Sequence, residues 1–174
     1  MVALVRVIER ITGSAGLLIA WVVFPLILAS VYEVVARYAF NAPTIWAFEL
    51  GYMAMGIHAI IGAAFALRER AHIRIDIIYM RFSNKTKAII DTTGYLVLFM
   101  PVVCWVSLGL WDYWMEAFMR NEHSGQSAWN PLIWPFRLSF FLGFFLLALQ
   151  GLAELIKCIR FLSGRTTEWN PTDG

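Results

Sequence analysis

Four long apolar blocks, interrupted by short polar segments, set the pattern of this chain. They cover residues 14–36, 44–67, 88–111 and 131–156. Each block is near or above the roughly 20 residues that an α-helix needs to cross a bilayer. Because lipid offers no hydrogen-bond partners, a crossing segment must satisfy its own backbone, which favours helices. The pattern therefore predicts an all-α integral membrane protein with four transmembrane helices, forming a single domain over residues 1–160 with a tail over residues 161–174.

Two of the polar segments are themselves amphipathic. The first 13 residues carry apolar side chains on one helical face, namely Leu4, Val7, Ile8 and Ile11. Such a segment can lie on the membrane surface. In the connection over residues 68–87, Ile73 and Ile77 alternate with Arg74 and Asp76, which predicts a second interfacial helix. A plain polar connector is the alternative there, because short runs are ambiguous in period.

The charges indicate an orientation. The chain is 60% hydrophobic and 15% charged, and most of its 14 basic residues lie in the N-terminal segment, the 68–87 connection and the C-terminal tail. The first and third connections hold only Arg37 and Arg120. Cytoplasmic connections of membrane proteins are enriched in Lys and Arg, so both termini and the 68–87 connection are predicted to be cytoplasmic. Basic groups between spans favour contact with anionic lipids over nucleic acid.

The fourth block begins with a cluster of aromatic and proline residues. Trp129 and Trp134 are expected at the membrane interface, where the indole ring is buried and its N–H reaches water. Pro131 or Pro135 can occupy the first helical turn, where no backbone donor is missed. Arg137 then lies one or two turns into the span.

Other charged residues lie at the same predicted depth as Arg137. Glu33 and Arg37 are four residues apart near the end of the first helix and are expected to pair. Glu49 lies about one turn into the second helix. Because charges inside a membrane are rarely left unpaired, Glu49 or Glu33 is predicted to bind Arg137. The alternative is that each side chain reaches the interface separately.

His58 lies near the middle of the second block, on a stripe of mostly small residues: Gly51, Met55, Gly62 and Ala66. Small residues let membrane helices approach closely, so His58 is expected to face another helix and donate a hydrogen bond. Gln150 and Glu154, one turn apart, are similar candidates for contacts with a helix or a partner.

The sequence holds no nucleophile–base pair, metal-binding cluster, phosphate-binding glycine loop or redox motif. A haem held by His58 would need a second histidine at matching depth, and His72 and His123 lie in connections on opposite sides. We therefore expect no enzymatic activity, no metal and no cofactor. The sequence therefore predicts a subunit of a larger assembly.

Three local motifs resemble those of a known family. The first is an Arg-Tyr-x-Phe-Asn turn followed by Trp and Glu; the second is a His-Ile-x-Ile-Asp stretch; the third is a Trp-x-Pro-x-x-x-Pro approach followed by Gln. In order, their residues are Arg37, Tyr38, Phe40, Asn41, Trp46 and Glu49; His72, Ile73, Ile75 and Asp76; Trp129, Pro131, Pro135 and Gln150. Over roughly residues 11–159 the chain resembles the small (Q-type) membrane subunit of tripartite ATP-independent periplasmic (TRAP) transporters. Ala42 is an extra residue in the first turn.

The resemblance implies a function. In such transporters a periplasmic binding protein captures an organic anion, a carboxylate or a sulfonate. A large permease subunit then moves the anion across the bacterial inner membrane, coupled to sodium. The small subunit has no transport site, packs beside the large one and holds it in the bilayer.

Two other functions compete with this one. The first is a haem- or quinone-binding anchor of a respiratory complex. The second is a small multidrug exporter, which would need an acidic residue deep in the first span, whereas Glu33 lies near its end.

Overall fold

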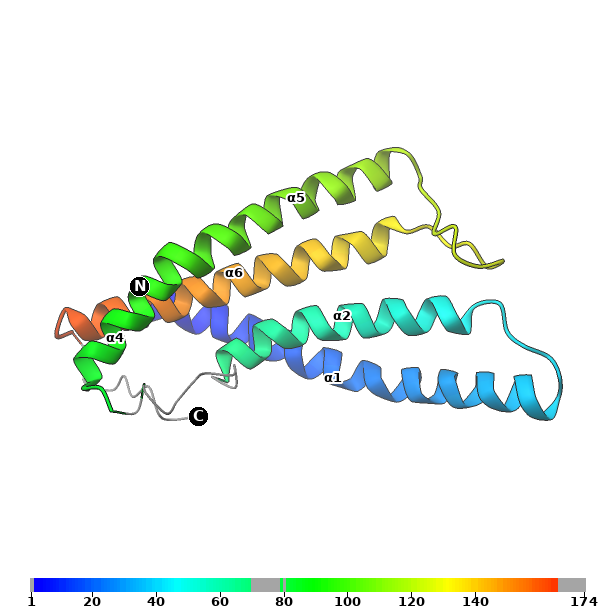
Figure 1. Cartoon of the computed structure of the whole chain (residues 1–174), viewed down its shortest axis with the longest axis horizontal. Helices are drawn as coiled ribbons and strands as arrows, with labels where there is room; N and C mark the ends of the chain where they lie inside the picture. Colours follow the sequence, from blue (N-terminus) through cyan, green and yellow to red (C-terminus); the bar gives the residue numbers. More distant parts are fainter. Residues whose placement is uncertain (1, 70–78, 80, 166–174) are drawn as a thin grey trace.

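The computed structural model describes residues 2–69, 79 and 81–165. Its first two long helices are α1, Val2–Ala39, and α2, Ala47–Arg68. The third span, Asn84–Met119, consists of α4 (Asn84–Thr93), the π-helical η1 (Gly94–Phe99) and α5 (Met100–Met119). The fourth is α6, Trp134–Leu162. All four are long and apolar enough to cross a membrane, which confirms the predicted fold class (Figure 1).

Helix α6 lies at the centre of the bundle. In Figure 1 the helices follow the order α5, α6, α2, α1 across the molecule. The main buried cluster joins α2, α5 and α6 through Ala64, Leu67, Val103 and Leu147. Helix α5 packs mainly against α6, whereas α1 packs against α2 and, near its start, against α6. Helix α6 therefore connects the two sides of the fold.

Helix α1 begins well before its apolar block. The N-terminal segment expected to lie on the membrane surface is continuous with the span, and it packs against α6 instead. Val5 and Ile8 are buried with Ala153 of α6, whereas Leu4 and Val7, on the face that the sequence marked as apolar, are exposed. Burial against α6 thus extends the helix beyond the residues needed to cross the bilayer.

Three glycines allow the helices to approach closely. A Cβ atom on Gly16 would lie 2.3 Å from Phe65 Cδ2, joining α1 to α2. On α6, a Cβ on Gly143 would lie 2.5 Å from Ile60 Cγ2, and one on Gly151 would lie 2.3 Å from Phe99 Cε1. Since no larger residue fits without displacing a neighbour, these glycines set the interhelical distances, as small residues commonly do in membrane helix pairs.

The third span contains a widened π turn that the sequence did not predict. The backbone N–H of Met100 donates to the carbonyl of Tyr95, five residues earlier. Pro101 follows directly and lacks the N–H that would bond the carbonyl of Val97. A short π segment is one way in which a helix accommodates such an interruption.

Two predicted features fall outside the described residues. The interfacial helix expected between the second and third spans includes residues 70–78 and 80, and with it His72 and Asp76. Most of the predicted tail, residues 166–174, is also outside.

Candidate functional site

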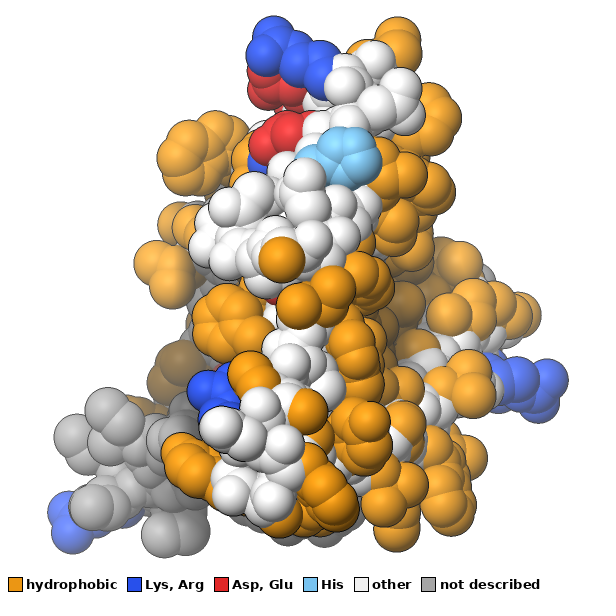
Figure 2. All heavy atoms as spheres, turned by 90° about the vertical axis from the view of Figure 1, so that its right-hand side faces the viewer, with side chains coloured by type: hydrophobic (Ala, Val, Ile, Leu, Met, Phe, Trp, Pro, Cys, Tyr) orange, Lys and Arg blue, Asp and Glu red, His pale blue; other side chains and the backbone are white. Residues whose placement is uncertain are grey.

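The polar residues of interest gather at the two ends of the bundle. We call the end formed by residues 40–46 and 120–133 the loop end, and the end that holds Val2 and Leu162 the terminal end (Figure 1). Seen from the loop end, backbone and uncharged polar side chains run along the middle, charged side chains gather at the top, and hydrophobic side chains cover the flanks (Figure 2).

At the loop end, Glu33 ties α1 to the following turn. Arg37 Nε donates to Glu33 Oε1 at 2.8 Å, so the predicted Glu33–Arg37 pair is confirmed. The other carboxylate oxygen accepts a hydrogen bond from the backbone N–H of Thr44 at 2.9 Å and another from its hydroxyl. One carboxylate therefore binds both sides of the α1–α2 connection. The sequence did not single out Thr44.

Asn41 and Trp46 complete the same turn. Asn41 adopts a left-handed conformation with φ of 53°, which asparagine tolerates better than most residues. Trp46 directly precedes α2, and its ring stacks on Tyr32 of α1 with centroids 6.2 Å apart. The first sequence motif thus forms the short connection that holds α1 and α2 antiparallel.

Arg137 pairs with Glu122, and the predicted pairing with Glu49 or Glu33 is wrong. Its Nη1 lies 2.7 Å from Glu122 Oε2 and its Nη2 lies 2.6 Å from Oε1, a bidentate arrangement. The guanidinium carbon also lies 3.7 Å from the ring centroid of Tyr113 on α5. Arg137 therefore points toward α5 and the third connection, whereas Glu33 binds the α1–α2 turn.

The fold of the third connection brings Glu122 to Arg137. His123 and Leu132 form an antiparallel bridge, and the N–H of Ile133 donates to the carbonyl of Glu122 at 2.9 Å. Asn121, Gly125 and Asn130 all have positive φ and reverse the chain, and the Gly125 N–H donates to Asn130 Oδ1 at 2.8 Å. This return of residues 122–133, which the pattern of apolar blocks did not predict, places Glu122 beside Arg137.

The aromatic residues at the start of α6 pack around this return. Trp134 meets Phe118 of α5 edge-on, with centroids 5.5 Å apart, and Pro135 lies in the first turn as predicted. Trp129 is only partly covered. The third motif therefore fixes the entry of α6 into the bundle.

Glu49 is fully buried at the beginning of α2. Among the described residues, neither of its carboxylate oxygens has a hydrogen-bond partner. Tyr52, one turn later, meets Phe136 of α6 edge-on, so this part of α2 faces α6. Burying a carboxylate without a partner is costly, which marks Glu49 as an unexplained polar group at this helix contact.

His58 does not face another helix of this chain in the way its small-residue stripe suggested. A Cβ atom added at Gly51 or Gly62 would meet nothing within 4 Å, and Met55 is exposed. His58 itself is half-buried and has no hydrogen bond within the part of the chain that the structure describes. The stripe therefore lies on an outer face of α2.

At the terminal end, Gln150 and Glu154 of α6 are both buried and lie in a polar chain that reaches α1. Gln150 Nε2 donates to Glu154 Oε1 at 3.0 Å. Lys157 Nζ lies 2.6 Å from Glu154 Oε1 and 2.6 Å from Glu9 Oε1 on α1. The bonds of Gln150 and Glu154 lie within α6, and Lys157 connects them to α1; whether either residue contacts a partner subunit stays a prediction.

These polar groups tie helices together, and their geometry offers no reaction centre. No group of three or more metal-binding side chains occurs among the residues that the structure describes. The ties instead fix the α1–α2 turn, the entry of α6, and the contact between α1 and α6.

A model of the family described as "Tripartite ATP-independent periplasmic transporters, DctQ component" matches residues 26–161. The chain belongs to this family. No curated protein and no solved structure matches it. As a DctQ component the chain is the small permease subunit of a TRAP transporter, a multi-pass protein of the inner membrane and not an enzyme. The DctQ match covers the Glu33 turn, the Arg137–Glu122 tie and nearly all of α6.

Proposed function

We propose that this chain braces the large permease subunit of a sodium-coupled TRAP transporter, which takes up an organic anion delivered by a periplasmic binding protein. The anion is a carboxylate or a sulfonate. Membership in the DctQ family supports the assembly, and the exposed apolar surface of three helices supports the bracing role.

The observation that carries the proposal is the imbalance in helix burial. In α6, 39% of the most apolar stretch is buried inside the chain, whereas the corresponding figure is 11% for each of the other three spans. Three helices therefore leave most of their apolar surface for lipid or for another membrane subunit. A small protein with this much unused apolar surface suits a role as a packing partner.

The internal ties support the same role, because a brace must be rigid. At the loop end, Glu33 of α1 accepts a hydrogen bond from Thr44 of the following turn, and Arg137 of α6 pairs with Glu122 of the third connection. At the terminal end, Lys157 of α6 pairs with Glu9 of α1. Between these ends, glycines bring α6 close to Ile60 and Phe99. Relative sliding of the helices would break several of these contacts at once.

The outer face of α2 is our candidate for contact with the large subunit. Gly51 and Gly62 open onto empty space there, and the half-buried His58 has no hydrogen bond among the described residues. Membrane helices associate through small residues and hydrogen bonds from polar side chains. A helix of the large subunit would supply both the packing and an acceptor for His58.

Uptake by the reconstituted system tests the proposed function. Vesicles holding this chain, the large permease and the binding protein should accumulate the anion when a sodium gradient is imposed, and omission of this chain should abolish uptake. Transport by this chain alone would overturn the proposal. Undiminished uptake without this chain would also overturn it.

A second experiment tests the proposed contact face. Gly62→Leu places a bulky side chain on the outer face of α2 and should reduce copurification with the large permease. Gly109→Leu is the matched control, because Gly109 of α5 also opens onto empty space. Equal retention of the partner by both variants would exclude this face of α2.

A further inference from the structure

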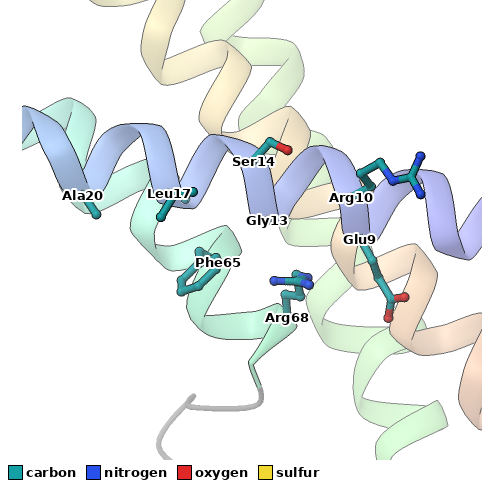
Figure 3. Close-up of a pocket in the computed structure, with 9 residues that line it drawn as sticks. Glu9, Arg10, Gly13, Ser14, Leu17, Ala20, Phe65 and Arg68 are labelled. Carbon is teal, nitrogen blue, oxygen red and sulfur yellow. The ribbon is translucent and has the colours of Figure 1, made fainter.

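A groove lies between α1 and α2 at the terminal end of the bundle. Its volume is about 470 Å³, and the described residues that line it all belong to α1 and α2 (Figure 3). The groove is independent of the polar ties described above, apart from Glu9, which it shares with the Lys157 contact.

Two glycines of α1 give the groove its shape. Gly16 seats the ring of Phe65, and the guanidinium of Arg68 lies against Gly13, where an added Cβ would be 2.9 Å from Nη1. In Figure 3, Phe65 and Arg68 both project from α2 toward α1. A side chain at either glycine would fill the space between the helices.

The two ends of the groove differ in chemistry. Arg10 and Arg68 line the end nearest the termini, whereas Leu17, Ala20 and Phe65 line the end that extends into the span. Arg10 and Leu17 are seven residues apart, about 10 Å along the helix. A ligand that fits this lining has an anionic group at one end and an apolar chain at the other.

The ion pairs around the groove leave two arginine side chains able to bind an anion. Glu9 Oε1 lies 2.6 Å from Lys157 Nζ of α6, so its charge is already paired. Arg68 pairs with the exposed Glu69 through Nη1, at 2.7 Å, and among the described residues its other nitrogens form no ion pair with a carboxylate. Arg10 is exposed and has no ion pair within the described residues. One arginine is therefore free, and the second is only partly occupied.

We propose that this groove binds an anionic phospholipid, with its phosphate at Arg68 and one acyl chain along Leu17, Ala20 and Phe65. The exposed Arg10, whose guanidinium points away from Arg68 in Figure 3, turns toward the phosphate when the lipid binds. Basic pockets between transmembrane helices at the cytoplasmic surface bind anionic headgroups. The concentration of basic residues at this end of the chain places the groove in the leaflet that is rich in such lipids. The proposal concerns this chain alone and does not depend on its partner subunits.

Lipid titration of the purified full-length chain tests the proposal. Phosphatidylglycerol and phosphatidylcholine are added to the chain in detergent, and the bound lipid is counted by native mass spectrometry. The double variant Arg10→Gln/Arg68→Gln should bind phosphatidylglycerol about thirtyfold more weakly, since each arginine near an anionic headgroup strengthens binding about fivefold and the two factors multiply. Arg10→Lys/Arg68→Lys keeps both charges and should retain most of the binding.

Control variants separate the groove from a general basic surface. Arg160→Gln/Arg165→Gln removes two basic residues from the same end outside the groove and should change binding less than about twofold. An equal loss in this control would overturn the proposal. Unchanged binding of phosphatidylglycerol by Arg10→Gln/Arg68→Gln would also overturn it. The same holds if the unaltered chain binds phosphatidylcholine as tightly as phosphatidylglycerol, because the groove would then recognise only the acyl chain.

Discussion

At the residue scale, the polar side-chain pairs differ in how far they could be predicted. Glu33–Arg37 and Gln150–Glu154 lie four residues apart, so helical geometry alone places each pair on one face. Glu122 lies 15 residues before Arg137 in a connection with no helical period, and only the bridge at His123 brings the two together. Sequence spacing predicts which side chains pair within one helix, but it does not predict a partner that lies in a connecting loop.

The Arg137–Glu122 pair should respond unequally to the loss of either partner. The Arg137 side chain is 9% exposed and that of Glu122 is 40% exposed. Glu122→Ala leaves a buried cation uncompensated and should cost about 3 kcal/mol of unfolding free energy. Arg137→Met leaves a carboxylate that water can solvate, and should cost about 1 kcal/mol.

Equilibrium unfolding of the purified chain in mixed micelles measures both changes. Glu116→Ala is the matched control, because its pair with Arg120 is exposed on both sides and should contribute little. A larger cost for Arg137→Met than for Glu122→Ala would contradict the burial of this pair.

At the element scale, the apolar blocks predicted the spans but not their ends. Apolar length reports the thickness of the hydrocarbon, and it says nothing of where a helix stops once it has left the lipid. Helix α1 continues to Val2 because α6 buries Val5 and Ile8 there, and α6 continues to Leu162 on the other side of the same contact. Such extensions depend on tertiary packing, which one sequence does not display.

The glycines of the helices should fall into two classes. Gly143→Ala places a methyl group against Ile60 and should cost about 1–3 kcal/mol through overpacking. Gly109→Ala meets open space in α5 and should be neutral or stabilise by up to about 1 kcal/mol, because alanine favours the helix. The unfolding midpoint of each variant, compared with that of the unaltered chain, measures both effects. A destabilised Gly109→Ala would show that another part of the protein packs against α5 at Gly109.

At the scale of the whole molecule, the central position of α6 was not predicted. The signals were present in Gly143 and Gly151, and in the buried polar residues Gln150 and Glu154. Small and polar residues on α2 suggested an equally central helix, yet Gly51 and Gly62 face outward. A single sequence shows that a face suits close packing, but not whether the neighbour belongs to the same chain.

The orientation of the bundle is a prediction of its own. With both termini cytoplasmic, a membrane-impermeant thiol reagent applied to intact cells should label Gln126→Cys at the loop end and spare Asn84→Cys at the start of α4. The exposed Cys104 is replaced by Ala in both variants, and the buried Cys158 is retained. Labelling of Asn84→Cys alone would reverse the topology.

The central place of α6 also has a consequence for biosynthesis. Of the four spans it leaves the ribosome last, yet α5 packs mainly against it and the N-terminal part of α1 is buried only once it is present. The α1–α2 hairpin can close as soon as both helices have entered the membrane, held by Glu33 and the Thr44 turn. Among the described elements, the third span packs mainly against α6, so it has no such partner until α6 has been synthesised. A ribosome that stops near residue 130 therefore releases one finished hairpin and one solitary helix, and that helix is the part of the nascent chain most open to membrane chaperones and proteases.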